Sequence, residues 1–248
     1  MSKNFIPIAK FFPSFITFLS LCIGLTSIRF ALDQKWELAV IAIIFSAILD
    51  CLDGKLARIL DSESTFGAEL DSLADLISFG VAPSFLLYFW RLGSIKFFGW
   101  GLTMAFVLCM AIRLARFNSL LQDNQNCQKF FFGVPAPMGG ILSLLPAILS
   151  FGEFPALDEL TTNQYFLCGY SALICLLVVS KIPTFSLKNT RIPKSLDSFV
   201  MLFLVACVVC LLIKPWITVP VLSLLYVASI PFSVYIYSRT ESKRQTDK

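Results

Sequence analysis

The stretch from Asp50 to Asp75 reads DCLDGKLARILDSESTFGAELDSLAD and places four aspartates, Asp50, Asp53, Asp71 and Asp75, in segments otherwise apolar enough to cross a bilayer. An acidic side chain at the centre of a membrane costs about 3 kcal/mol on insertion scales, so four close together need compensation. Acids at membrane depth usually mark a functional site. A divalent cation is the simplest compensating partner.

The spacing of the aspartates predicts a metal site between two helices. Asp50 and Asp53 are three residues apart and Asp71 and Asp75 are four apart, so each pair lies on one face of a helix. The polar segment 59–66 suits a short connection between antiparallel helices, which would make the two pairs face each other. Carboxylate oxygens favour Mg²⁺, Mn²⁺ or Ca²⁺ over zinc, and one or two ions could bind.

Small residues and one arginine accompany the acids. Gly54, Ala57 and Gly67 would let either a neighbouring helix or the phosphate of a ligand approach the backbone. Arg58 places a permanent cation where a metal-bridged diphosphate would need one. A snorkelling arginine at a helix end is the alternative interpretation of Arg58.

Composition predicts an all-α, polytopic membrane helix bundle. The chain is 57% hydrophobic and 15% charged, with a mean hydropathy of +0.79. Eight apolar stretches are long enough, or nearly so, to span a bilayer, and six or seven spans are the alternatives. They are 14–31, 36–53, 67–90, 97–117, 137–151, 165–181, 197–213 and 216–237.

The distribution of cations predicts the orientation. Fifteen Lys and Arg residues fall at the termini and in alternate loops, and five fall on the opposite side. The positive-inside rule then puts both termini and the aspartates on the cytoplasmic side of the cell (inner) membrane. We expect a single domain, 1–248, with a catalytic part at about 13–190, further transmembrane helices at 197–237 and a basic tail at 238–248.

Histidine is absent from the chain, which excludes Ser-His-Asp chemistry and histidine general bases and leaves carboxylates as the natural acid and base groups. The eight cysteines are scattered through apolar stretches, and we interpret them as small apolar residues. Nothing in the sequence predicts a nucleic-acid partner.

The run Asp50-x2-Asp53-Gly54-x2-Ala57-Arg58-x8-Gly67-x3-Asp71-x3-Asp75 resembles the signature of the CDP-alcohol phosphotransferases, with no gap or substitution. The resemblance implies an integral membrane enzyme with two divalent ions, Mg²⁺ or Mn²⁺, held by the first three aspartates. It places Asp75 close to the metals, as a fourth candidate ligand, and at the position of the general base. It also implies a set of residues at the CDP moiety: Thr17, Asp50, Asp53, Gly54, Ala57, Arg58 and Gly67.

Thr17 belongs to a weaker part of the resemblance. Pro13-Ser14-x2-Thr17 is similar to the family's Pro-Asn-x2-Thr opening, whose threonine lies near the nucleotide. Ser14 and Ser20 depart from the asparagines of many relatives. A hydroxyl bonded back to its own helix is the alternative role for Thr17 and Ser20.

Three downstream segments bear on the acceptor alcohol. Arg113-Leu-Ala-Arg116-Phe-Asn118, Phe132-Gly-Val-Pro-Ala-Pro137 and Val179-Ser-Lys-Ile-Pro-Thr-Phe-Ser-Leu-Lys188 resemble segments of bacterial phosphatidylserine synthases. Their cations could capture a carboxylate or phosphate, and serine has a carboxylate whereas glycerol and choline do not. The predicted acceptor-binding residues are Arg113, Arg116, Asn118 and Lys188. The alternative is that these cations only satisfy the positive-inside rule.

The resemblance therefore implies a phosphatidylserine synthase, which would join CDP-diacylglycerol and L-serine and release CMP. Another enzyme of the family, such as a phosphatidylglycerophosphate, phosphatidylinositol phosphate or phosphatidylcholine synthase, is the nearer alternative. A cation transporter with intramembrane acids is the distant one. A homodimer is expected from the family resemblance alone.

Overall fold

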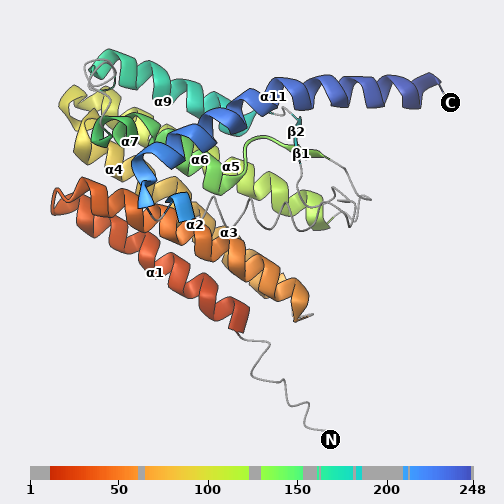
Figure 1. The fold of residues 1–248 in the computed structure, drawn as a ribbon, viewed down its shortest axis with the longest axis horizontal. Coiled ribbons are helices and arrows are strands. Elements are labelled where there is room, and N and C mark those ends of the chain that lie inside the picture. The colour runs from red at the N-terminus through yellow and green to blue at the C-terminus, as the bar shows by residue number, and fades with distance from the viewer. Residues whose placement is uncertain are drawn as a thin grey trace, which may run out of the picture.

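A computed structural model describes residues 12–60, 65–122, 130–152, 161, 163–180, 183–185, 209–211 and 213–246 of the chain. Helices dominate this part and run roughly side by side (Figure 1). Their bounds are α1 (Phe12–Leu32), α2 (Trp36–Ile59), α3 (Thr65–Asp75), η2 (Leu76–Val81), α4 (Ala82–Trp90), η3 (Leu92–Ile95), α5 (Phe97–Gln122), α6 (Ala136–Ser143), α7 (Leu145–Phe151), α9 (Gln164–Val179) and α11 (Pro215–Thr246). Two short strands, β1 (Phe130–Phe132) and β2 (Pro183–Phe185), pair antiparallel.

The structure confirms the predicted class of fold, a bundle of apolar helices typical of a membrane protein. Within the described residues four helices are long and apolar enough to cross a bilayer: Phe12–Leu32, Thr65–Trp90, Phe97–Ser119 and Pro215–Val234. The predicted count of eight spans is not established. Helix α2, which contains the predicted span 36–53, is not among the four, α6 and α7 are separate short helices, and α9 has 16 residues. Most of the predicted span 197–213 lies outside the described residues.

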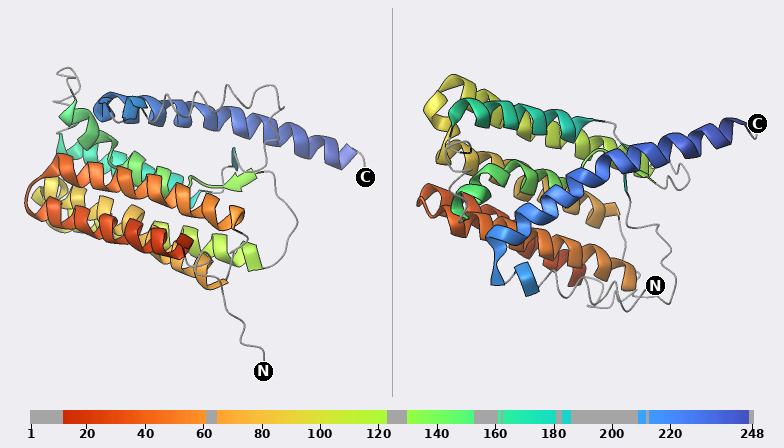
Figure 2. Two further views of the ribbon diagram at one scale, coloured as in Figure 1. Left: turned by 60° about the horizontal axis from the view of Figure 1, so that its bottom comes forward. Right: turned by 45° about the horizontal axis from the view of Figure 1, so that its top comes forward.

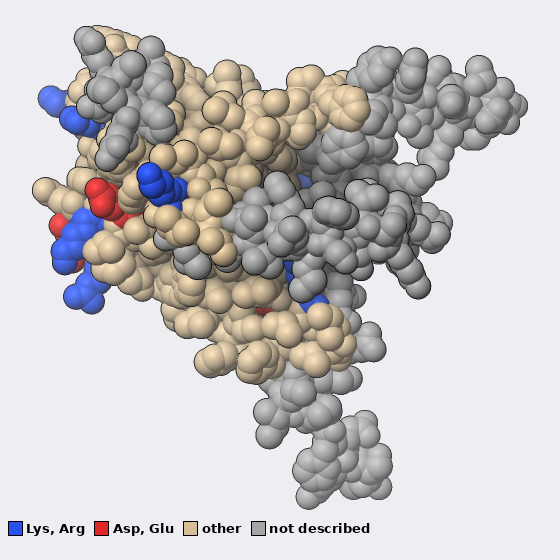
Figure 3. All heavy atoms as spheres, in the orientation of Figure 1, with Lys and Arg blue, Asp and Glu red and all other residues tan. Residues whose placement is uncertain are grey.

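The lateral surface is apolar, as lipid requires. Large side chains such as Phe15, Leu108 and Leu224 are 64%, 61% and 62% exposed, which a water-soluble bundle would avoid. In Figure 3 the visible charged side chains gather mainly at the end where α1 turns into α2, and the flank beside them is largely uncharged.

The α1–α2 hairpin is held by small residues and a pair of serines. The face of α1 that is buried carries Thr17, Ser20, Gly24, Ser27 and Ala31 at helical spacing. The Ser20 and Ser46 hydroxyls lie 2.8 Å apart, and each also lies within 3.1 Å of the other residue's carbonyl oxygen. Small residues let the two backbones approach closely, and hydrogen bonds across helices are a usual means of association in membranes. Ser20 therefore bonds across the helix pair and not back to its own helix.

A π-helical segment follows the last aspartate directly. The helix that begins at Thr65 changes to π geometry at Leu76–Val81 and continues as α4 without a break. Neighbouring glycines let other helices reach this segment, because a Cβ atom on Gly140 would lie 2.9 Å from the Phe79 carbonyl oxygen. A Cβ atom on Gly24 would likewise overlap the Ser78 side chain. Contacts with α1, α5 and α6 thus fix the segment next to Asp75.

The topology brings five helix ends together at one end of the bundle. There α1 begins, α2 ends, α3 begins, and α5 and α9 end, as the two views of Figure 2 show. The long helix α11 contacts β2, α6 and α7 and crosses the bundle obliquely in the right-hand view of Figure 2. All four aspartates of the signature lie on the helices that meet at this end.

We predict that Gly140→Ala destabilises the protein by about 1–3 kcal/mol, because the added methyl group meets the backbone of Phe79, which cannot move aside as a side chain could. Gly169→Ala in α9 is the matched control, since a Cβ atom there meets nothing within 4 Å. Thermal unfolding in detergent should show a lower Tm for Gly140→Ala alone. Equal Tm values for the two variants would contradict the close packing at η2.

Candidate active site

Three aspartates converge where α2 approaches α3. One carboxylate oxygen each from Asp50, Asp53 and Asp71 lies within 4.8 Å of the others. Asp53 is only 2% exposed, and its Oδ2 atom is buried with no hydrogen-bond partner among the described residues. The Asp50 carboxylate is also within hydrogen-bonding range of both Asp71 and Asp75. The two pairs predicted to face each other are therefore brought together.

This cluster fits a divalent cation. Carboxylates at such separations repel one another unless a proton or a cation lies between them. Two oxygens on one ion can be at most about twice the metal–oxygen distance apart, which is roughly 4–5 Å for Mg²⁺ and Ca²⁺. The observed limit of 4.8 Å is in that range. The unpartnered buried oxygen of Asp53 is the strongest single indication, because leaving such a group unsatisfied is costly.

Asp75 adjoins the triad without belonging to it. The three carboxylate oxygens that lie within 4.8 Å of one another do not include one from Asp75. Asp75 instead interacts with Asp50, a member of the triad. Its Oδ1 atom is buried and has no hydrogen-bond partner in the described part of the chain. Asp75 also interacts electrostatically with Arg113 of α5. An acid held next to a carboxylate cluster, with one oxygen that lacks a hydrogen-bond partner among the described residues, is suited to accept a proton.

The residues predicted to contact CDP lie beside the triad. Thr17 is 6% exposed and donates to the Pro13 carbonyl oxygen at 3.1 Å, and its side chain is also within hydrogen-bonding range of Asp53. A Cβ atom on Gly54 would meet nothing within 4 Å among the described residues, so packing against that part of the chain does not require a glycine there. Ala57 and Gly67 are half-buried on α2 and α3. Arg58 lies in the last turn of α2, and its side chain is outside the described residues.

The predicted acceptor-binding residues differ in their surroundings. The Nε and Nη1 atoms of Arg113 are buried and have no hydrogen-bond partner among the residues described. Arg116 instead donates from Nη1 to the Val179 carbonyl oxygen at 3.1 Å, where it binds the last turn of α9. The Asn118 Oδ1 atom accepts from the Ser72 hydroxyl at 3.0 Å, which ties α5 to α3. Lys188 lies outside the described residues.

Two residues at this end were not predicted. Ser72 donates a hydrogen bond to Asn118. The only signal in the sequence for a role of Ser72 is that it directly follows Asp71. Tyr226 of α11 interacts electrostatically with Arg113, although more than a hundred residues separate them in the chain. No local pattern in the sequence signals such a contact.

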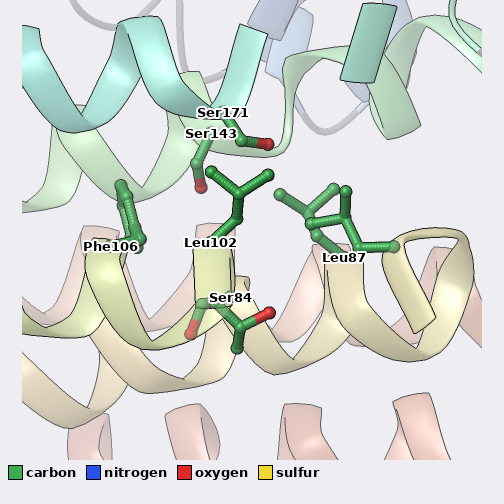
Figure 4. Close-up of a pocket in the computed structure, with 8 residues that line it drawn as sticks. Ser84, Leu87, Leu102, Phe106, Ser143 and Ser171 are labelled. Carbon is green, nitrogen blue, oxygen red and sulfur yellow. The ribbon is translucent and has the colours of Figure 1, made fainter. Parts of the chain in front are cut away.

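An internal cavity between α4, α5, α6 and α9 is a poorer candidate site (Figure 4). Its volume of ≈ 10 Å³ holds no more than one water molecule. Ser84 and Ser143, which line it, donate back to carbonyl oxygens of their own helical segments at 2.8 and 2.7 Å. None of the four aspartates lines this cavity.

Comparison with known proteins gives a consistent result. The family profile described as CDP-alcohol phosphatidyltransferase matches residues 10–180, and a second, CDP-alcohol phosphatidyltransferase 2, matches 196–231. A protein of Mycobacterium leprae named CDP-diacylglycerol–serine O-phosphatidyltransferase is 38% identical over 90% of this chain and 74% of its own length. Proteins of the same name in Helicobacter pylori and Bacillus subtilis are 36% and 37% identical. They cover 78% and 70% of this chain and 79% and 89% of their own lengths.

We predict that Asp53→Asn lowers the affinity for Mn²⁺ at least 10- to 100-fold. Replacing even a residue that only supports a metal ligand usually lowers the metal affinity by that factor. The Mn²⁺-dependent rise in Tm should shrink accordingly, because a ligand stabilises the fold in proportion to its binding. Without metal the variant should be at least as stable as the wild type, because one repelling charge is gone.

Glu37→Gln is the matched control for Asp53→Asn. Glu37 lies on the same helix, in the first turn of α2, where it is exposed and far along the chain from the cluster. Its replacement should leave the Mn²⁺ response intact. An equal response to Mn²⁺ in wild type, Glu37→Gln and Asp53→Asn would contradict the metal site.

Proposed function

This chain belongs to the CDP-alcohol phosphatidyltransferase family, and from that premise we propose that it is a phosphatidylserine synthase. It transfers the phosphatidyl group of CDP-diacylglycerol to the hydroxyl of L-serine and forms phosphatidylserine and CMP. The observation that carries the proposal is the convergence of Asp50, Asp53 and Asp71, with Asp75 and Arg113 next to them. Two buried nitrogens of Arg113 have no hydrogen-bond partner among the described residues. The names of the relatives support serine as the acceptor.

The donor is held by the triad side of the site. Asp50, Asp53 and Asp71 would hold two Mg²⁺ or Mn²⁺ ions, whose chemistry is to neutralise the diphosphate and stabilise the departing CMP. Gly54 leaves open space beside these acids, so the nucleotide can approach the backbone of α2 closely. Thr17, Ala57, Arg58 and Gly67 complete the proposed CDP-binding group.

The acceptor is activated on the Asp75 side. The serine hydroxyl gives its proton to the free Oδ1 atom of Asp75 as its oxygen forms a bond to the lipid-side phosphorus. The bond from that phosphorus to the CMP oxygen breaks in the same displacement, so CMP leaves with the bonding electron pair. Arg113 offers two buried N–H groups to the serine carboxylate. Arg116, Asn118 and Lys188 are assigned to the same acceptor side, and the first two also brace the helices there.

The site faces the cytoplasm in our proposal. The asymmetry of fifteen against five cations supports this orientation, with both termini and the aspartates in the cytoplasm and eight spans in the cell membrane. The chain acts as one domain, 1–248, with its catalytic part at about 13–190, and forms a homodimer like its family. Membership of this family disfavours the cation-transporter alternative.

We predict that the purified protein releases CMP from CDP-diacylglycerol with Mn²⁺ or Mg²⁺ when L-serine is present. Glycerol 3-phosphate, inositol phosphate and choline should give no release, because the proposed site selects the carboxylate of serine, which none of them carries. Asp53→Asn, which removes a proposed metal ligand, should abolish release. Turnover with another alcohol would retain the metal site and overturn the serine assignment, and silence with all four would overturn the proposed activity.

The roles of Asp75 and Asp53 should separate in binding experiments. We predict that Asp75→Asn lowers kcat by about 10²- to 10⁴-fold, the usual contribution of a general base. Its binding of CDP-diacylglycerol should stay near that of the wild type, whereas Asp53→Asn should lose binding together with turnover. Equally poor binding of the lipid by the two variants would show that this division of roles is wrong.

A further inference from the structure

Ser72 links two helices that carry different parts of the site. Its hydroxyl donates to the Asn118 Oδ1 atom at 3.0 Å. Ser72 lies on α3, one residue after Asp71 and three residues before Asp75. Asn118 lies near the end of α5, five residues after Arg113. The bond therefore joins the turn that carries two of the aspartates to the helix that carries the proposed carboxylate-binding arginine.

The Ser72 hydroxyl also has an acceptor on its own helix. The Ala68 carbonyl oxygen lies 3.1 Å from it, in the arrangement by which serines inside helices bond back to the residue four positions earlier. Ser119 of α5 makes the same kind of bond, to the Ala115 carbonyl oxygen at 3.0 Å. Among the described residues, Ser72 differs from Ser119 in its additional contact with a side chain of another helix.

Helix α3 is lightly packed, so such a contact can decide where its aspartates lie. Ala74 is its one buried residue, and Phe66 and Leu73 are 67% and 60% exposed. The main contacts of α3 are with α1 and η2, and not with α5. Hydrogen bonds between membrane helices contribute only modestly to stability, so the protein should fold without this one. Its effect should instead appear in the placement of α3 relative to α5.

We propose that Ser72 is a positioning residue that acts through Asn118 to hold the aspartate-bearing turn of α3 in place beside α5. This inference rests on the proposed function and deepens it. The proposed metal ligand Asp71 and the proposed base Asp75 lie on one side of the bond, and Arg113 lies on the other. Transfer to serine requires both sides at once, whereas the metal is held by α2 and α3 alone. A misplacement of about 1 Å between reacting groups can lower a rate by about 10²-fold.

The test is Ser72→Ala, with CMP release measured at saturating L-serine and CDP-diacylglycerol in the presence of Mn²⁺. We expect kcat to fall about 10- to 100-fold, because the base and the bound serine are no longer held together. The Tm, its rise with Mn²⁺ and the KM for CDP-diacylglycerol should stay near the wild-type values. Ser72→Thr keeps the hydroxyl and should recover most of the rate.

Ser119→Ala is the matched control, since it removes a hydroxyl that bonds back to its own helix next to Asn118. It should release CMP at the wild-type rate. A double variant tests the path of the effect. Adding Ser72→Ala to Asn118→Ala should lower kcat no further, because the hydroxyl acts through that amide.

Three results would overturn this inference and leave the proposed function intact, given a wild type that uses serine. They are an unchanged kcat in Ser72→Ala, an equal loss in Ser119→Ala, and independent losses from Ser72→Ala and Asn118→Ala that multiply in the double variant. A lower Tm with a lost response to Mn²⁺ in Ser72→Ala would show a structural role instead. A wild type that releases no CMP with serine would overturn the proposed function and this inference with it.

Discussion

Mutual repulsion of carboxylates inside a membrane protein is the constraint on which the rest of this structure depends. Asp50, Asp53 and Asp71 bring oxygens within 4.8 Å of one another, and Asp75 joins them through Asp50. Such a group is costly unless a proton or a cation lies between the carboxylates, and a rigid arrangement of the carboxylates suits a cation. The serine-bonded α1–α2 hairpin and the locked π-helical segment after Asp75 provide that rigidity.

The polar residues near the end of α5 differ in how far the described residues satisfy them. Arg116 gives a hydrogen bond to the end of α9, and Asn118 accepts one from Ser72 of α3, so both also hold helices in place. Arg113 keeps two buried nitrogens without hydrogen-bond partners in the described part of the chain. A buried guanidinium with open donors is suited to a carboxylate or phosphate ligand, and its neighbour Asp75 is suited to the proton transfer.

Local periodicity explains what could be predicted from the sequence. The expected spans 14–31 and 97–117 lie within α1 and α5, and the spacing of the aspartates correctly put their carboxylates on facing helices. The π-helical turn at 76–81 has no local sequence pattern that we identified, and its close contacts with Gly24 of α1 and Gly140 of α6 depend on the tertiary packing. Tyr226 was missed for a related reason, since its electrostatic influence on Arg113 depends on how α11 crosses the bundle.

The most direct test of this account is the position of a bound metal. Crystals of the protein grown with Mn²⁺ would give an anomalous difference map from data collected at the manganese absorption edge. Our account predicts density between the carboxylates of Asp50, Asp53 and Asp71, with Asp75 alongside. Manganese bound elsewhere, with those three carboxylates left without an ion, would contradict it.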